Sequence, residues 1–135
     1  MYKAISFEEH RDRRGALVAL ESTREVPFEI KRVYFIYDTD PNYERGFHAH
    51  LKLKQLLICV SGSVDILVSE GPEQREVINL NEPSKGLLIE GVVWREMKNW
   101  KPGTVLLVFA SEFYNREDYI FDFEEFISLA KKRNT

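Results

Sequence analysis

Short segments rich in β-branched and aromatic residues, separated by turn residues at close intervals, most constrain the fold of this chain. These segments span residues 30–37, 55–60, 64–69, 76–80, 86–89, 92–97 and 105–110. Gly, Pro, Asn and Ser mark the turns between them, as at residues 61–63 and 101–103. Short strands with such turns are typical of a sandwich or barrel. The pattern predicts an all-β fold, with a hairpin turn at residues 61–63.

The end of the chain has a different periodicity. Four apolar residues fall on one face of a predicted helix: Phe123, Phe126, Ile127 and Ala130. Asp122 precedes this run and suits the N-cap position, where a carboxylate accepts a backbone N–H. A chain of 135 residues fits one domain. We therefore expect a single β-domain over residues 1–135, closed by a short C-terminal helix.

Composition excludes several classes of protein. The formal net charge is −3, whereas nucleic-acid-binding domains are more often basic, so no nucleic-acid partner is expected. The single cysteine, Cys59, excludes an intrachain disulfide and a multi-cysteine zinc site. No apolar run approaches the roughly 20 residues that span a bilayer, and residues 1–6 lack the apolar core of a signal peptide. We expect a cytoplasmic protein without a membrane partner.

The densest polar cluster is the segment 45–50, Arg-Gly-Phe-His-Ala-His. Residues two apart in a strand point to the same side, so His48 and His50 are expected to share a face. Paired imidazoles on the inner wall of a barrel suit metal binding or proton transfer. A solvent-facing pair on a sheet edge is the weaker interpretation, because two of the three histidines of the chain fall here.

Five residues resemble the first cupin motif, a His-x-His followed by a carboxylate and a glycine: Gly46, His48, His50, Gln55 and Gly62. Gln55 stands where that motif has its glutamate ligand, and Trp94 stands where the second motif has a histidine. A neutral amide is a poor substitute for a carboxylate, and an indole offers only an N–H donor. A tight transition-metal site needs three or four good ligands. The chain therefore resembles a cupin that has lost its metal, which leaves the histidines as acid and base.

A more specific resemblance covers nearly the whole chain. The segments 27–34, 45–50, 55–63, 93–97 and 118–120 resemble, in this order, the sugar 3,4-ketoisomerases. These enzymes act on dTDP-4-oxo-6-deoxyglucose in the synthesis of deoxyamino sugars for bacterial surface glycans such as lipopolysaccharide or S-layer glycan. The resemblance implies a cupin jelly-roll barrel and a homodimer with strand exchange near the N-terminus. It also implies a pocket that holds the dTDP-sugar without a metal or cofactor.

The resemblance gives His48 and His50 the catalytic role, with Tyr37 nearby as a proton donor. Moving a carbonyl from C4 to C3 requires removal of the C3 proton, an enediol intermediate and delivery of a proton to C4. A histidine can both take and return that proton. The residues alone do not decide which histidine is the principal base. They equally allow Tyr37 to be a core or rim aromatic.

Arginine and amide side chains supply the expected substrate contacts. A diphosphate favours guanidinium forks, and Arg14, Arg32 and Arg95 are the candidates. Arg45, next to the histidines, is a candidate to stabilise the charge that develops on an enediolate. Gln55 is expected to face the same side and to bind sugar hydroxyls.

Three other functions are open at this point. A dTDP-sugar 3,5-epimerase also combines a barrel, a histidine base and a tyrosine. A non-catalytic cupin module could sense a sugar, although the chain has no segment that resembles a DNA-binding element. A metal-dependent dioxygenase is disfavoured by Gln55 and Trp94, which replace two ligands.

Overall fold

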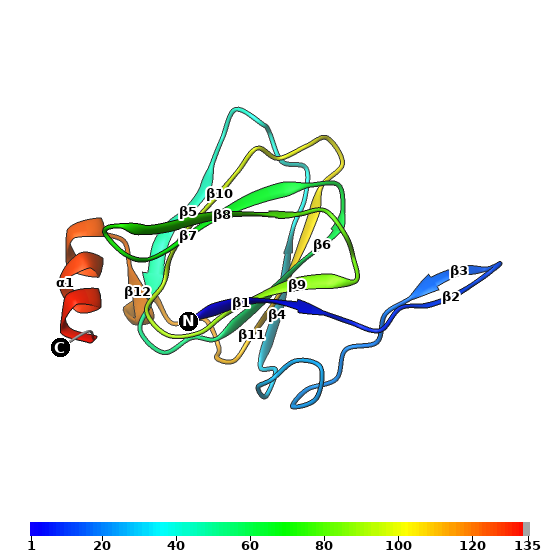
Figure 1. Cartoon of the computed structure of the whole chain (residues 1–135), viewed down its shortest axis with the longest axis horizontal. Coiled ribbons are helices and arrows are strands. Elements are labelled where there is room, and N and C mark those ends of the chain that lie inside the picture. Colours follow the sequence, from blue (N-terminus) through cyan, green and yellow to red (C-terminus); the bar gives the residue numbers. More distant parts are fainter. Residues whose placement is uncertain (134–135) are drawn as a thin grey trace.

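The computed structural model describes residues 1–133 and consists of two five-stranded antiparallel sheets with one C-terminal helix (Figure 1). The first sheet has the strand order β1 (Tyr2–Ser6), β9 (Lys85–Ile89), β6 (Gln55–Ser61), β11 (Val105–Ala110) and β4 (Arg32–Ile36). The second has the order β12 (Tyr119–Ile120), β5 (Arg45–His50), β10 (Trp94–Lys98), β7 (Val64–Gly71) and β8 (Gln74–Leu80). The predicted all-β architecture with a closing helix is confirmed.

The seven predicted segments correspond to β4 and to β6 through β11, with shifts of a few residues at their ends. The chain also forms strands that its pattern did not predict. These are β1, which pairs with β9, the short β12, which pairs with β5, and a separate hairpin of β2 (His10–Asp12) and β3 (Gly15–Leu17). A 3₁₀ turn, η1 (Arg116–Asp118), precedes β12. Each of these strands has only two to five residues, so alternation gives little signal.

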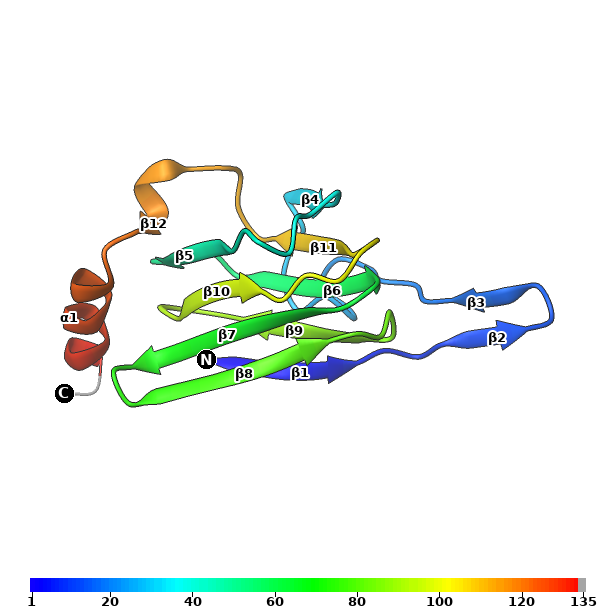
Figure 2. The same cartoon turned by 90° about the horizontal axis from the view of Figure 1, so that it is seen from above.

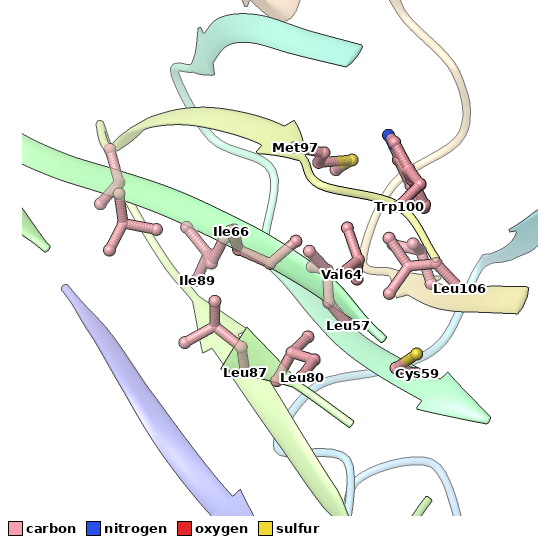
Figure 3. Close-up of a cluster of buried hydrophobic side chains, with 13 residues drawn as sticks. Leu57, Cys59, Val64, Ile66, Leu80, Leu87, Ile89, Met97, Trp100 and Leu106 are labelled. Atoms are coloured by element: carbon pink, nitrogen blue, oxygen red, sulfur yellow. The ribbon is translucent and has the colours of Figure 1, made fainter. Parts of the chain in front are cut away.

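The main core lies between the two sheets (Figure 3). Strand β6 contributes Leu57 and Cys59 to it, together with Ile66 of β7 and Leu106 of β11. The opposite face of β6 is also buried, because Leu56 and Ile58 pack against Phe7, Val26 and Phe28 in a second cluster. Burial on both faces explains why β6 has a continuous apolar run instead of an alternating pattern.

The helix α1 (Phe123–Arg133) fixes the end of the second sheet that carries the histidines. Phe126, Ile127 and Ala130 are buried and pack in one cluster with Ala49 of β5 and Trp94 of β10. The Oδ1 atom of Asp122 accepts the backbone N–H of Glu124 at 2.9 Å, as an N-cap residue does. The predicted helix, its buried face and its N-cap are confirmed.

The predicted hairpin at residues 61–63 is wrong. β6 pairs with β9 and β11, whereas β7 pairs with β8 and β10, so this turn carries the chain from one sheet to the other. The turn is tied to the loop before β11: Ser63 donates its backbone N–H to Oγ1 of Thr104 at 3.1 Å, and that hydroxyl bonds the Ser63 carbonyl. These bonds stabilise the turn as a crossover between the sheets.

The hairpin β2–β3 projects from the two sheets on the side opposite α1 (Figures 1 and 2). All six of its strand residues are exposed. Asp12 accepts N–H groups of Arg14 at the hairpin turn, from the backbone at 2.8 Å and from the guanidinium. Among residues 1–133, no helix has the length and apolar character needed to cross a membrane.

Gly62→Ala tests the turn between the sheets. The φ angle of Gly62 is +81°, and an added Cβ would lie 2.6 Å from Cα of Thr104. We expect the free energy of unfolding, measured by urea titration, to fall by about 3 kcal/mol, from backbone strain and overpacking together. Gly103→Ala is the matched control, because φ there is +77° and a Cβ meets open space. Its expected loss is about 1 kcal/mol, and equal losses for the two variants would contradict the packing account.

Candidate active site

Strand β5 brings both histidines to one side of the second sheet. It lies between β10 and β12, with His48 opposite Arg95 and His50 opposite Tyr119. Ala49 points to the helix cluster, so alternation turns the two imidazoles the other way. Their ring centroids lie 4.8 Å apart in an edge-to-face arrangement. The shared face that the sequence predicts is therefore present.

A β-bulge at the start of β5 sets the position of His48. The register with β10 shifts between Arg95 and Glu96, and Phe47 adopts a φ of 59°, which is unusual for a non-glycine residue. Gly46 has a φ of +92°, and a Cβ there would lie 2.9 Å from the carbonyl oxygen of Arg95. The glycine therefore lets β5 approach β10 closely and places His48 beside Arg95.

Arg95 is fully buried and joins the two sheets. Its Nη1 donates to Oε1 of Gln55 on β6 at 2.5 Å, and its Nη2 donates to the carbonyl of Val93 at 2.9 Å. Gln55 in turn donates from Nε2 to the phenol oxygen of Tyr34 at 3.0 Å. Burial lowers the pKa of Arg95 to about 10, so it stays positively charged at neutral pH. A fixed positive charge therefore lies beneath the histidines.

Both imidazoles are neutral at neutral pH. Burial, reinforced by the charge of Arg95, lowers the pKa of half-buried His48 to about 4. Burial lowers the pKa of fully buried His50 further, to about 2, with contributions from Arg95, His48 and Arg32. A neutral imidazole has one lone pair that can accept a proton. Each ring therefore has a lone pair that can accept a proton from a ligand.

His50 has one anchored and one unpartnered ring nitrogen. Its Nδ1 lies 3.2 Å from Oδ2 of Asp118, the last residue of η1, which directly precedes β12. Its Nε2 is buried without a hydrogen-bond partner in the part of the chain that the structure describes. Such an atom is costly unless a ligand satisfies it.

Two cavities meet at Arg32 and Tyr119, which line both. The larger has a volume of about 560 Å³ and is also lined by His50, Lys52, Leu53, Glu112, Phe113, Tyr114, Asn115 and Asp118. The smaller has a volume of about 300 Å³ and is also lined by Tyr34, Ile36, Arg45, Gly46, His48 and Met97. Each histidine therefore borders a different lobe of one continuous region.

The structure brings four of the other expected residues to this region. Arg32 lies on the inward face of β4, with its guanidinium 5.3 Å from the ring centroid of Tyr34. Its Nε atom is buried and unpartnered within residues 1–133. Arg45 lines the smaller cavity, and Arg95 and Gln55 form its buried support.

Two expected residues are not brought to the histidines within this chain. Tyr37 follows β4, where alternation turns Arg32 and Tyr34 inward and Phe35 and Tyr37 outward. The phenol of Tyr37 is 58% exposed, and its ring packs 5.7 Å from that of Phe35 on the outer face. Arg14 lies at the turn of the projecting hairpin.

Sequence reasoning missed Tyr34, Lys52, Asp118 and Tyr119, which line or support the cavities. Alternation from Arg32 would have identified Tyr34 as an inward residue. Asp118 and Tyr119 lie in a segment that was recognised, but a two-residue strand has no periodicity. Nothing in the sequence indicates that Lys52 borders the site.

The donor set does not fit a resident metal ion. Gln55, at the place of the cupin glutamate, is bonded to the Arg95 guanidinium. Trp94, at the place of the second-motif histidine, donates from Nε1 to Oε2 of Glu96 at 2.9 Å. Within residues 1–133 no group of three or more His, Cys, Asp or Glu residues is arranged to hold a metal. A buried cation beside the imidazoles also opposes a second one.

Comparison with known proteins places this site in a family. The family described as "FdtA: WxcM-like, C-terminal" matches residues 1–131. The TDP-4-oxo-6-deoxy-α-D-glucose-3,4-oxoisomerase of Aneurinibacillus thermoaerophilus is 42% identical over 132 residues, which cover 98% of this chain and 94% of that protein.

Solved structures agree with that match in sequence and in fold. The QdtA sugar 3,4-ketoisomerase of Thermoanaerobacterium thermosaccharolyticum, in complex with TDP, is 45% identical with a TM-score of 0.95, covering 98% of this chain and 96% of that one. A histidine-to-asparagine mutant of the same enzyme is known in complex with TDP-4-keto-6-deoxyglucose. The WlaRB TDP-quinovose 3,4-ketoisomerase of Campylobacter jejuni is 52% identical with a TM-score of 0.90, covering 94% and 97%. The chain described here belongs to the FdtA/WxcM-like family.

Proposed function

We propose that this chain is a TDP-4-oxo-6-deoxyglucose 3,4-ketoisomerase that works by histidine acid–base catalysis. The observation that carries the proposal is the pair of neutral imidazoles of His48 and His50, whose ring centroids lie 4.8 Å apart beside the fixed charge of Arg95 and which line two adjoining cavities. Relatives that carry this activity in their names are 42% and 45% identical and match nearly the whole chain.

Two cationic side chains of the larger cavity suit the nucleotide diphosphate, although Glu112 and Asp118 also line this cavity. Arg32 and Lys52 line it, and the unpartnered Nε of Arg32 offers a donor to an anionic oxygen. The ring of Tyr114 lies 5.7 Å from the Arg32 guanidinium and offers an aromatic face to the base. The diphosphate and base therefore lie in the larger cavity near Arg32 and Tyr114, and the sugar lies where the two cavities meet at Tyr119, between His50 and His48.

His48 is the group that moves the carbon-bound proton. It is half-buried and lines the smaller cavity, so it can contact a sugar, and its low pKa keeps it unprotonated before reaction. It removes the proton from C3, and the electron pair of that bond moves to O4 through the new C3–C4 double bond. The imidazolium then returns a proton to C4. C3 is oxidised and C4 reduced within one molecule, so no external oxidant or reductant is needed.

The oxygen-bound proton moves in the same direction, from O3 to O4, and exchange with solvent then returns His50 and Tyr34 to their starting protonation states. His50 accepts the proton of the O3 hydroxyl at its unpartnered Nε2 as C3 becomes a carbonyl. Tyr34 has its phenol oxygen bonded by Gln55, which leaves its O–H free to donate to O4. Arg45 and Arg95 stabilise the negative charge of the enediolate between these steps.

The active unit is a homodimer with an exchanged N-terminal hairpin. The hairpin β2–β3 is fully exposed, and Leu17 on it is 58% exposed. The outer face of β4 exposes Val33, Phe35 and Tyr37, a set of apolar neighbours that a second copy of the chain would cover. The hairpin of one protomer then carries Arg14 to the substrate site of its partner.

The reaction gives a 3-oxo sugar, which is a substrate for amination at C3. The enzyme would then act in the cytoplasm, in the synthesis of deoxyamino sugars for surface glycans, and an aminotransferase would be the next enzyme. One domain spanning residues 1–135 suffices for it.

Loss of the His48 imidazole tests the assignment of the base. We expect the purified chain to convert TDP-4-oxo-6-deoxyglucose to the 3-oxo isomer, followed by proton NMR. His48→Asn is expected to lower kcat by about 10²–10⁴-fold, because a general base contributes about that much, while TDP binding measured by calorimetry is retained. Full turnover by the variant would remove His48 from the mechanism.

The same assay separates Tyr34 of β4 from Tyr37, which follows that strand. We expect Tyr34→Phe to lower kcat by about 10²-fold, since it removes the donor to O4. Tyr37→Phe keeps the exposed aromatic ring and is expected to leave kcat within about twofold, because its hydroxyl points away from the cavity. The reverse result would make Tyr37 the donor.

Mixed dimers test the hairpin exchange. Arg14→Ala and His48→Asn are each expected to be nearly inactive as pure proteins. If Arg14 acts in the partner's site, half of the dimers after co-refolding are hybrids with one intact site, so activity returns to about one quarter of the wild-type value. Mixtures with no more activity than the two single variants would contradict hairpin exchange. A monomer in sedimentation experiments would contradict it as well.

A further inference from the structure

The carboxylate of Asp118 lies against Nδ1 of His50, and both residues line the larger cavity. Its Oδ1 accepts the backbone N–H of Lys52 at 2.8 Å. Its Oδ2 lies 3.3 Å from the backbone nitrogen of Leu53, which donates to it, and 3.2 Å from Nδ1 of His50. The side chain of Asp118 is 15% exposed, and that of His50 is 0% exposed. The pair is therefore sheltered and closely held.

These contacts decide which nitrogen of His50 carries its proton. The imidazole is neutral, because burial and the charges of Arg95 and Arg32 lower its pKa. A neutral imidazole has one N–H donor and one lone pair, whereas an ionised carboxylate only accepts. The N–H must then lie on Nδ1, where it donates to Asp118. The lone pair lies on Nε2, the buried atom that has no partner within residues 1–133.

We propose that Asp118 is a positioning residue for the reaction, which holds His50 as the Nδ1–H tautomer so that Nε2 accepts the O3 proton. This inference rests on the proposed ketoisomerase function. Asp118 touches neither the sugar nor the reacting carbons, and it acts through the imidazole. Its role parallels the general use of a buried carboxylate to orient a histidine base.

The carboxylate also balances the charge that His50 gains. When Nε2 accepts a proton, an imidazolium forms among groups that face it from four elements: His48, Arg32, Arg95, Tyr119 and, at the cavity wall, Lys52. Three of these are cations and disfavour the imidazolium. Asp118 brings a negative charge against Nδ1 of the same ring, so the proton transfer becomes less costly.

A purely structural role is the alternative that an experiment must exclude. Besides its side-chain bonds to residues 52 and 53, Asp118 accepts the backbone N–H of Leu51 at its own carbonyl, at 3.0 Å. Its loss could therefore loosen the end of β5 without any effect on the tautomer. Stability alone does not separate the two roles.

Nitrogen NMR of histidine-labelled protein separates them directly. We expect the long-range ¹⁵N–¹H pattern of His50 in the wild-type holoprotein with bound TDP to be that of the Nδ1–H tautomer. Asp118→Asn presents an amide N–H toward Nδ1, and the pattern is expected to change to the Nε2–H tautomer. An Nε2–H tautomer in the wild type would overturn the inference, whatever the activity of the protein.

Kinetics of Asp118→Asn provide the second readout. We expect kcat to fall by about 10²-fold or more while KM changes by less than about threefold, since the carboxylate is engaged by His50 and by the backbone of residues 52 and 53. Asp122→Asn is the matched control, because it makes the same chemical change four residues away, at the N-cap of α1. Its kcat is expected to match that of the wild type.

A double-mutant cycle completes the test. His50→Asn keeps a side-chain N–H that can bond Asp118 but removes Nε2. In that background Asp118→Asn is expected to reduce the residual kcat by less than about twofold, because the group through which it acts is gone. An equal loss in both backgrounds would make Asp118 structural. A wild-type chain without ketoisomerase activity would instead refute the proposed function, and the NMR result would still decide the tautomer.

Discussion

The guanidinium of Arg95 is the interaction on which the site depends. It is a charge with no exposed surface, and it bridges the sheets by bonding Gln55 on β6 and the carbonyl of Val93 before β10. Burying a charge is costly unless it is hydrogen-bonded. The same charge contributes to lowering the pKa values of both histidines, and in the proposed mechanism it stabilises the enediolate. Replacement of two cupin metal ligands by Gln55 and Trp94 fits this arrangement, in which an arginine supplies the positive charge.

Backbone geometry places His48, Arg32 and Tyr34 around that charge. The helix α1 binds the opposite face of β5 through Ala49, and the bulge at Gly46 and Phe47 brings His48 next to Arg95. On the facing sheet, alternation along β4 turns Arg32 and Tyr34 inward. A few close approaches between backbone segments thus set the positions of the side chains at the site.

Much of the fold could be predicted from the sequence, because the interior strands and the helix have strong apolar patterns. The shared face of His48 and His50 also followed from alternation alone. Alternation does not show which strands pair with one another. The turn at Gly62 was therefore misread as a hairpin, whereas bonds between Thr104 and Ser63 tie it to the loop before β11. The resemblance gave Tyr37 as the proton donor, whereas in this chain Tyr37 lies on the exposed face and Tyr34 on the face toward the cavity, a distinction that requires knowledge of the strand's partners. Asp118 was missed because its function depends on a contact with a residue 68 positions earlier.

The central claim is that a proton moves between C3 and C4 of one sugar, and deuterium labelling tests it most directly. The chain would be incubated with TDP-4-oxo-6-deoxyglucose in heavy water and the product analysed by proton NMR. Because half-buried His48 exchanges its proton with solvent, the account predicts a 3-oxo product with deuterium at C4 and protium at C5. Deuterium at C3 or C5 with the 4-oxo group retained would contradict it and indicate an epimerase. Tight TDP binding without any exchange would contradict it as well and indicate a binding module.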